Sequence, residues 1–94
     1  EKYRRRFLSR RREAGLRTAK RLMRAGLIKE GQEHIGTGVE LLRQAKKWGM
    51  TGEEMGLIGG VFYRDILVKE VGEAQAREIL RKAGLASEIK NLKA

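Results

Sequence analysis

Arginine and lysine are the residues in this sequence whose type and spacing could carry chemistry, and they are concentrated at one end. Residues 1–29 hold twelve basic and two acidic side chains, which account for the whole formal net charge of +10, whereas residues 30–94 hold ten of each. Nine of the twelve are arginines, whose planar guanidinium binds two phosphate oxygens at once and stays charged at any physiological pH. The pattern therefore indicates binding of a phosphate-rich polyanion through Lys2, Arg4, Arg5, Arg6, Arg10, Arg11, Arg12, Arg17, Lys20, Arg21, Arg24 and Lys29.

The sequence offers little for catalysis or metal binding. Cysteine is absent, which excludes a disulfide framework, a thiolate zinc site and a cysteine nucleophile. The single histidine, His34, follows Glu30 and Glu33, but a metal site would need further ligands from elsewhere in the chain. The single aspartate, Asp65, lies beside Arg64 rather than opposite a second acid, so a paired-carboxylate site is unsupported. We expect a protein that is not an enzyme, with no catalytic residue, no metal and no cofactor.

A solvated helix face or contact with an anionic membrane would also account for a basic segment. Between Lys2 and Lys29 only Glu13 interrupts the basic residues, whereas a solvated face normally intersperses acidic ones. Membrane docking requires bulky apolar residues opposite the charge, and this segment offers only a modest strip of them. No uncharged stretch approaches the ~18 residues of a membrane-spanning helix. We therefore favour nucleic acid as the partner of this segment.

The elements that position these residues are predicted to be helices. Proline is absent, and apolar residues recur at intervals of three and four, which is typical of amphipathic helices. Thr51 followed by Glu54 matches a capping box and marks a helix start. Glycine after each apolar run predicts the helix ends, at Gly26, Gly49, Gly72 and Gly84. The sequence thus predicts an all-α protein of four to five helices, near residues 3–25, 30–48, 51–71 and 73–83, with a short one after Ser87.

The charge pattern divides the expected fold into two parts. We expect residues 1–29 to form a basic helix or arm that wraps nucleic acid, extending from a small helical bundle of residues 30–94 that packs subunits together. The residues expected to face the core are Leu16, Ala19, Leu22, Met23, Ile35, Val39, Leu42, Ala45, Met55, Leu57, Ile58, Val61, Phe62, Ile66, Leu67, Ala76, Ile79, Leu80 and Ala83.

Glycines recur every four residues in the third predicted helix, at Gly52, Gly56 and Gly60. Each costs up to ~1 kcal/mol of helix stability relative to alanine. Small residues on one helix face let another backbone approach, so we expect a tight helix crossing there, within the chain or across a dimer. The alternative is a kinked, frayed helix. A helix-turn-helix that reads bases is disfavoured at this corner, because Glu53 and Glu54 would face the phosphates.

The run Trp48-Gly49-Met50-Thr51-Gly52 and the glycine-spotted helix after it resemble the coat proteins of filamentous double-stranded DNA viruses of hyperthermophilic archaea, of the rudivirus, lipothrixvirus and tristromavirus type. The likeness extends over about residues 48–85. It implies a capsid subunit whose basic N-terminal helices wrap A-form DNA and whose C-terminal bundle forms the outer wall, paired as homodimers or as heterodimers with a related coat subunit. It also implies that Arg43, Lys46 and Lys47 face the DNA. This chain is shorter than the family's coats and has a denser arginine run at its start.

Taken together, the sequence predicts a structural capsid subunit that coats and compacts linear double-stranded DNA without reading its sequence, in a helical filamentous virion. The alternative is a cellular protein that binds nucleic acid non-specifically, either chromatin-like or an RNA-binding module of ribosomal type. The expected location is the virion, or the cytoplasm in association with the nucleoid under the alternative.

Overall fold

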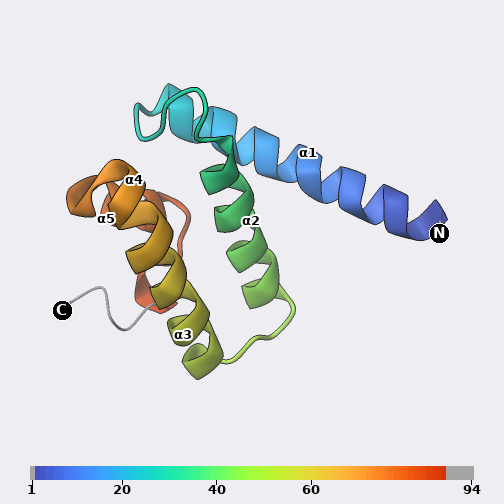
Figure 1. The fold of residues 1–94 in the computed structure, drawn as a ribbon. Coiled ribbons are helices and arrows are strands. Elements are labelled where there is room, and N and C mark those ends of the chain that lie inside the picture. Colours follow the sequence, from blue (N-terminus) through green and yellow to red (C-terminus); the bar gives the residue numbers. More distant parts are fainter. Residues whose placement is uncertain (1, 89–94) are drawn as a thin grey trace.

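The computed structural model describes the backbone of residues 2–88 and the side chains of residues 12–87. Over this range the protein is all-helical and contains no strand, which confirms the predicted fold class (Figure 1). The elements are α1 (Lys2–Arg24), α2 (Glu33–Lys47), α3 (Gly52–Phe62), the π-helical turn η1 (Tyr63–Leu67), α4 (Val68–Val71), α5 (Glu73–Lys82) and the 3₁₀ turn η2 (Ala86–Glu88).

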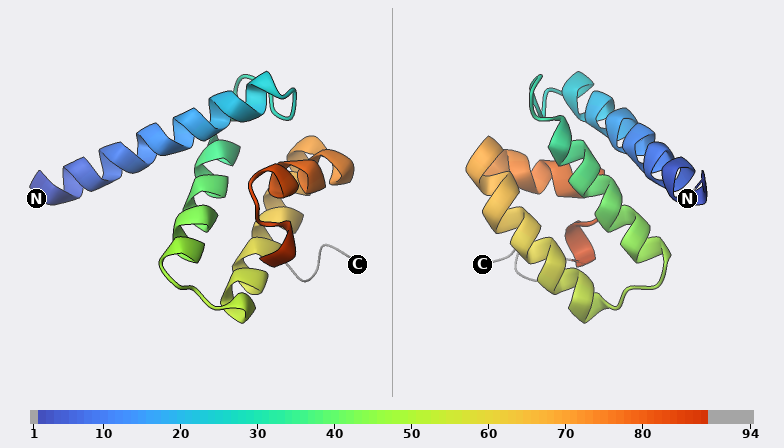
Figure 2. Two further views of the ribbon diagram at one scale, coloured as in Figure 1. Left: turned by 180° about the vertical axis from the view of Figure 1, so that it is seen from behind. Right: turned by 45° about the vertical axis from the view of Figure 1, so that its right-hand side comes forward.

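The helices form a small bundle from which α1 projects. The C-terminal half of α1 packs across one end of α2, and its N-terminal half extends beyond the rest of the protein (Figure 1). α2 lies between α1 and α3, and α5 packs back against them (Figure 2). The predicted arrangement, a basic N-terminal helix extending from a helical bundle, is therefore present. Leu22, Leu27 and Ile28 belong to the same buried cluster as the bundle, so one core joins residues 12–29 to the remainder.

α1, α2 and α5 end in the same way. At the end of α1 the N–H of Leu27 donates to the carbonyl of Leu22 (2.9 Å) and the N–H of Gly26 donates to the carbonyl of Met23 (2.9 Å). This pair of hydrogen bonds is the Schellman motif, which requires a left-handed residue and so favours glycine. Equivalent pairs of hydrogen bonds end α2 and α5. The glycines at the three helix ends have φ angles of 75° (Gly26), 92° (Gly49) and 73° (Gly84).

The remaining helix boundaries also follow local signals, with one correction. The hydroxyl oxygen of Thr51 accepts the backbone N–H of Glu54 (3.3 Å), as the predicted cap requires. Gly72, at φ 86°, separates α4 from α5. α2 was expected from residue 30 but begins at Glu33, because Gly31 takes a φ of 95° that a helix cannot contain.

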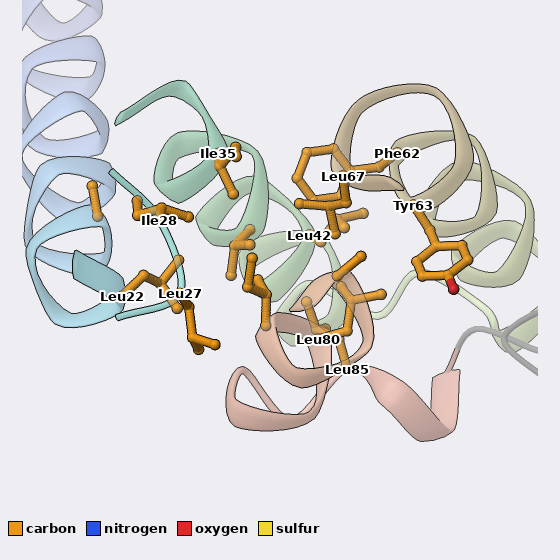
Figure 3. Packing of buried hydrophobic residues seen from close by; sticks show 14 of the residues in the cluster. Leu22, Leu27, Ile28, Ile35, Leu42, Phe62, Tyr63, Leu67, Leu80 and Leu85 are labelled. Carbon is orange, nitrogen blue, oxygen red and sulfur yellow. The ribbon is translucent and has the colours of Figure 1, made fainter. Parts of the chain in front are cut away.

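The core is continuous from the end of α1 to α5 (Figure 3). Met23, Ala45 and Ala83, expected in the core, are only partly buried. The prediction is confirmed for the buried residues Ala19, Leu22, Ile35, Val39, Leu42, Met55, Phe62, Leu67, Ala76, Ile79 and Leu80. Four further residues are buried that were not predicted to be: Leu27, Ile28, Tyr63 and Leu85.

Several residues expected in the core are instead exposed, most of them on α3 and η1. In η1 Leu67, five residues after Phe62, takes the buried position that a regular helix would give to Ile66, because a π-helical turn holds an extra residue. The buried face of α3 consists of three glycines together with Met55 and Phe62, so its remaining aliphatic residues face outward. The wrongly placed residues and their exposed fractions are Leu16 (42%), Leu57 (69%), Ile58 (46%), Val61 (45%) and Ile66 (37%).

Candidate nucleic-acid interface

The basic residues of α1 lie on a long helix with most of its surface open. At 1.5 Å per residue a helix of 23 residues is ~35 Å long, close to the ~34 Å of one DNA turn. The exposed basic residues are Arg12, Arg17, Lys20, Arg21 and Arg24, followed by Lys29 in the loop. Lys2, Arg4, Arg5, Arg6, Arg10 and Arg11 lie within the backbone of α1, but their side chains fall outside the described residues.

Two glycines fix α1 against α2. A Cβ atom on Gly36 would lie 2.6 Å from the backbone nitrogen of Ala19 on α1. A Cβ atom on Gly15 would lie 2.8 Å from Oγ1 and 3.0 Å from Cα of Thr37 on α2. Cβ atoms essentially never lie within 3.0 Å of a non-bonded atom of a residue elsewhere in the chain, so this crossing requires glycine at Gly36. The direction in which α1 projects is set by this contact.

A polar contact holds the same crossing. The hydroxyl of Thr18, a buried residue of α1, donates to Oε2 of Glu40 on α2 (2.9 Å). The Glu40 side chain is only 13% exposed and also accepts from Nη1 of Arg43 (3.4 Å) and from the amide of Gln44 (3.3 Å). These donors satisfy the carboxylate. The guanidinium of Arg43 is therefore partly neutralised within the chain, although its side chain remains 46% exposed.

The basic surface of α1 continues through two adjoining grooves onto α2 and the end of α5. One, of about 190 Å³, lies between Arg21, Arg43 and Lys82. The other, of about 540 Å³, continues from Arg43 past Lys46 and Lys47 to the end of α5. Nζ of Lys46 also donates to the carbonyl of Gly84 (3.4 Å). These grooves hold five basic side chains and one carboxylate, that of Glu40, an arrangement that creates positive potential and attracts a polyanion.

Two basic residues of α5 are paired with acidic ones. Nη2 of Arg77 lies 3.0 Å from Oε1 of Glu73, and Arg81 forms an ion pair with Glu78. The hydrogen bond from Arg81 holds the pKa of the Glu78 carboxyl below its ordinary value. By contrast, within the described side chains no basic residue of the range 12–29 forms an ion pair. The positive charge of residues 12–29 is thus left available to another molecule.

The structure brings four of the nine candidate basic residues with described side chains together in the grooves, and adds one. Arg21 of α1 and the three basic residues of α2 line the two grooves. Lys82 was not among the candidates, although the sequence places it in the last turn of a predicted helix, where cations are favoured. Of the three candidate packing glycines, Gly56 and Gly60 are buried, whereas Gly52 is exposed with no described atom within 4 Å of a Cβ position.

His34 contacts a carboxylate of a distant helix. Its Nε2 lies 2.7 Å from Oε2 of Glu70, and the side chain is 52% exposed. No group of three or more histidine, cysteine, aspartate or glutamate residues in the described part of the chain is placed to hold a metal ion. Among the same residues, no helix is both long and apolar enough to span a membrane.

Comparisons with protein-family models, curated protein sequences and solved structures found no match to this chain. The resemblance to archaeal virus coat proteins therefore stays a prediction.

Proposed function

We propose that this chain is a structural subunit that coats and compacts double-stranded DNA without reading its sequence, as a capsid protein of a helical filamentous virion. The observation that carries the proposal is the set of exposed cations from Arg12 to Lys29, which form no ion pair among the described side chains and adjoin the basic grooves of α2 and α5. Such a surface offers several phosphate contacts along one duplex turn, and phosphate contacts supply most of the affinity of non-specific binding.

The proposed lack of sequence reading rests on how the charged residues are distributed over the helices. Base recognition in the major groove relies on side chains held at fixed positions, above all bidentate arginine, asparagine and glutamine contacts at the end of a docked helix. Here the basic residues of α1 from Arg12 onward are spread along its exposed length. The first turn of α3 presents Glu53 and Glu54, which repel phosphate. The proposed role of the surface is charge neutralisation.

Charge-neutralising variants test the binding surface. Deleting residues 1–29 would also remove Leu22, Leu27 and Ile28 from the core, so substitution of exposed residues is the better test. The triple variant Arg17→Gln, Lys20→Gln, Arg24→Gln removes three cations of α1. Its matched control, Lys69→Gln, Arg77→Gln, Arg81→Gln, removes the same residue types from exposed positions outside the proposed surface.

Binding of a 30-base-pair duplex is measured by fluorescence anisotropy at several salt concentrations. Each phosphate contact contributes ~0.9 to the slope of log affinity against log salt, so the α1 variant should lower the magnitude of this slope by about 2 to 3. The control should leave it close to the wild-type value. Equal slopes for the two variants would reject the proposed surface.

Assembly separates a capsid subunit from a cellular binding protein. The wild-type chain mixed with linear duplex DNA is imaged by electron microscopy. Filaments of constant diameter, formed equally on DNA of unrelated sequences, support the capsid role. Discrete or irregular complexes support the cellular nucleic-acid-binding alternative, and stronger binding to RNA than to DNA supports its ribosomal form.

A further inference from the structure

α3 and the start of η1 carry an exposed stripe with apolar residues in its centre and opposite charges at its ends. Leu57 is 69% and Val61 is 45% exposed, and Glu54 and Arg64 are exposed on either side of them. The four residues are three, four and three positions apart, which places them along one face of a helix. No charged residue occurs between Glu54 and Arg64. We refer to these four residues as the α3 stripe.

The apolar surface continues from the α3 stripe across to α2. Ile58, Leu41 and Ile66 are 46%, 48% and 37% exposed, and they line a groove of about 600 Å³ between α2 and α3. Contiguous apolar surface of this kind is uncommon on isolated proteins and marks interaction sites. The helix that carries most of this surface, α3, lies on the opposite side of α2 from α1 (Figure 2).

The charges at the ends of the stripe make it complementary to itself. Glu54 and Arg64 lie at equal sequence distances from Gly59, as do Leu57 and Val61. When two copies of α3 pack antiparallel about a two-fold axis that crosses the stripe midway between Leu57 and Val61, Glu54 of each copy lies opposite Arg64 of the other. A two-fold interface uses the same patch on both subunits, so this ion pair forms twice.

Within the described residues neither terminal charge of the stripe is already engaged. The side chains of Glu54 and Arg64 form no ion pair there, and the cap at Glu54 uses only its backbone N–H. Nucleic acid and anionic lipid are poor occupants, because they offer no cation to Glu54 and its exposed neighbour Glu53, whereas a second copy of the chain offers Arg64.

We propose that the protein forms a homodimer in which the α3 stripes of two copies pack antiparallel, with Leu57 against Val61 and Glu54 against Arg64 of the second copy. The dimer leaves both α1 helices on its outer sides, free to contact other molecules. The proposal does not depend on the proposed DNA binding, because its tests contain no nucleic acid.

The apolar centre of the stripe is tested by the mass of the protein in solution. Light scattering after size-exclusion chromatography, at ~0.1 M salt so that charges are only partly screened, should give the wild type twice its chain mass of 10.7 kDa. Leu57→Asp should reduce the mass to that of one chain. The matched control, Leu16→Asp, changes an exposed leucine of α1 (42% exposed) and should leave the dimer intact. Circular dichroism establishes that both variants are folded.

The antiparallel register is tested by exchanging charges. Glu54→Arg and Arg64→Glu each place like charges opposite one another twice, so each should weaken the homodimer at least about tenfold. The stripe of the Glu54→Arg variant then has arginine at both ends, and the stripe of the Arg64→Glu variant has glutamate at both ends. An equimolar mixture should therefore recover dimers of near wild-type affinity, which a variant that merely misfolds could not do. A monomeric wild type, a dimer insensitive to Leu57→Asp, or a mixture that shows no recovery would each overturn the proposal.

Discussion

Replacing Gly36 with alanine tests whether the α1–α2 crossing depends on the close approach of two backbones. The new Cβ would lie 2.6 Å from the backbone nitrogen and 2.7 Å from Cα of Ala19. Because backbone atoms cannot rotate away, the two helices must separate. Overpacking of this kind costs up to ~3 kcal/mol, and the higher helix propensity of alanine returns up to ~1 kcal/mol. We expect a net loss of about 2 kcal/mol in the free energy of unfolding.

The assay is thermal and urea unfolding followed by circular dichroism. For a domain of this size a loss of about 2 kcal/mol lowers the melting temperature by roughly 8 to 16 °C. Gly52→Ala is the matched control, because no described atom lies within 4 Å of its Cβ position. The control should be neutral or gain up to ~1 kcal/mol. If Gly36→Ala is as stable as the wild type or the control, the described crossing is wrong.

Three further outcomes are expected. Thr51→Ala removes the hydroxyl that caps α3 and should lower the free energy of unfolding by ~1 kcal/mol in urea titrations, whereas Thr51→Ser should retain most of it. Lys82→Gln should weaken duplex binding and lower the magnitude of its log–log salt slope by about 1, while Lys69→Gln should change neither. The backbone N–H of Gly31 donates to the carboxylate of Glu33 (2.8 Å) and lowers its pKa. An NMR titration of Glu33 should therefore give a pKa below the ordinary glutamate value, and its contribution to stability should be present at neutral pH and disappear as the pH falls through that pKa; an unshifted value would contradict the contact.

The helix ends were predictable because their signals are local. A helix stops where the backbone must take a positive φ, and glycine alone does so without steric cost. Gly26, Gly49, Gly72 and Gly84 mark such ends in the sequence and have positive φ angles in the structure. Thr51 caps the helix that follows it for an equally local reason. Where a second glycine, Gly31, lies just beyond the expected start of α2, the prediction placed that start three residues early.

The faces that the helices bury could not be predicted as well. Periodicity places Leu57, Ile58 and Val61 together on α3, but it does not show which side of the helix meets the core. The π-helical turn η1 changes the periodicity after Phe62, so that Leu67 is buried as predicted whereas Ile66 is exposed. Neither effect has a signature within a few residues of sequence, because both depend on what packs against the helix.

The sequence by itself determined that the chain is helical, where its helices end, and that its excess positive charge belongs to residues 1–29. Only the tertiary structure decided that Gly36 meets Ala19, that Lys82 lies beside Arg21 and Arg43, and that the apolar stripe of α3 is left uncovered. The physical reason is the range of the forces involved. Backbone dihedral preferences and net charge act within a few residues, whereas packing joins side chains that are distant along the chain and is settled only by how whole helices fit together.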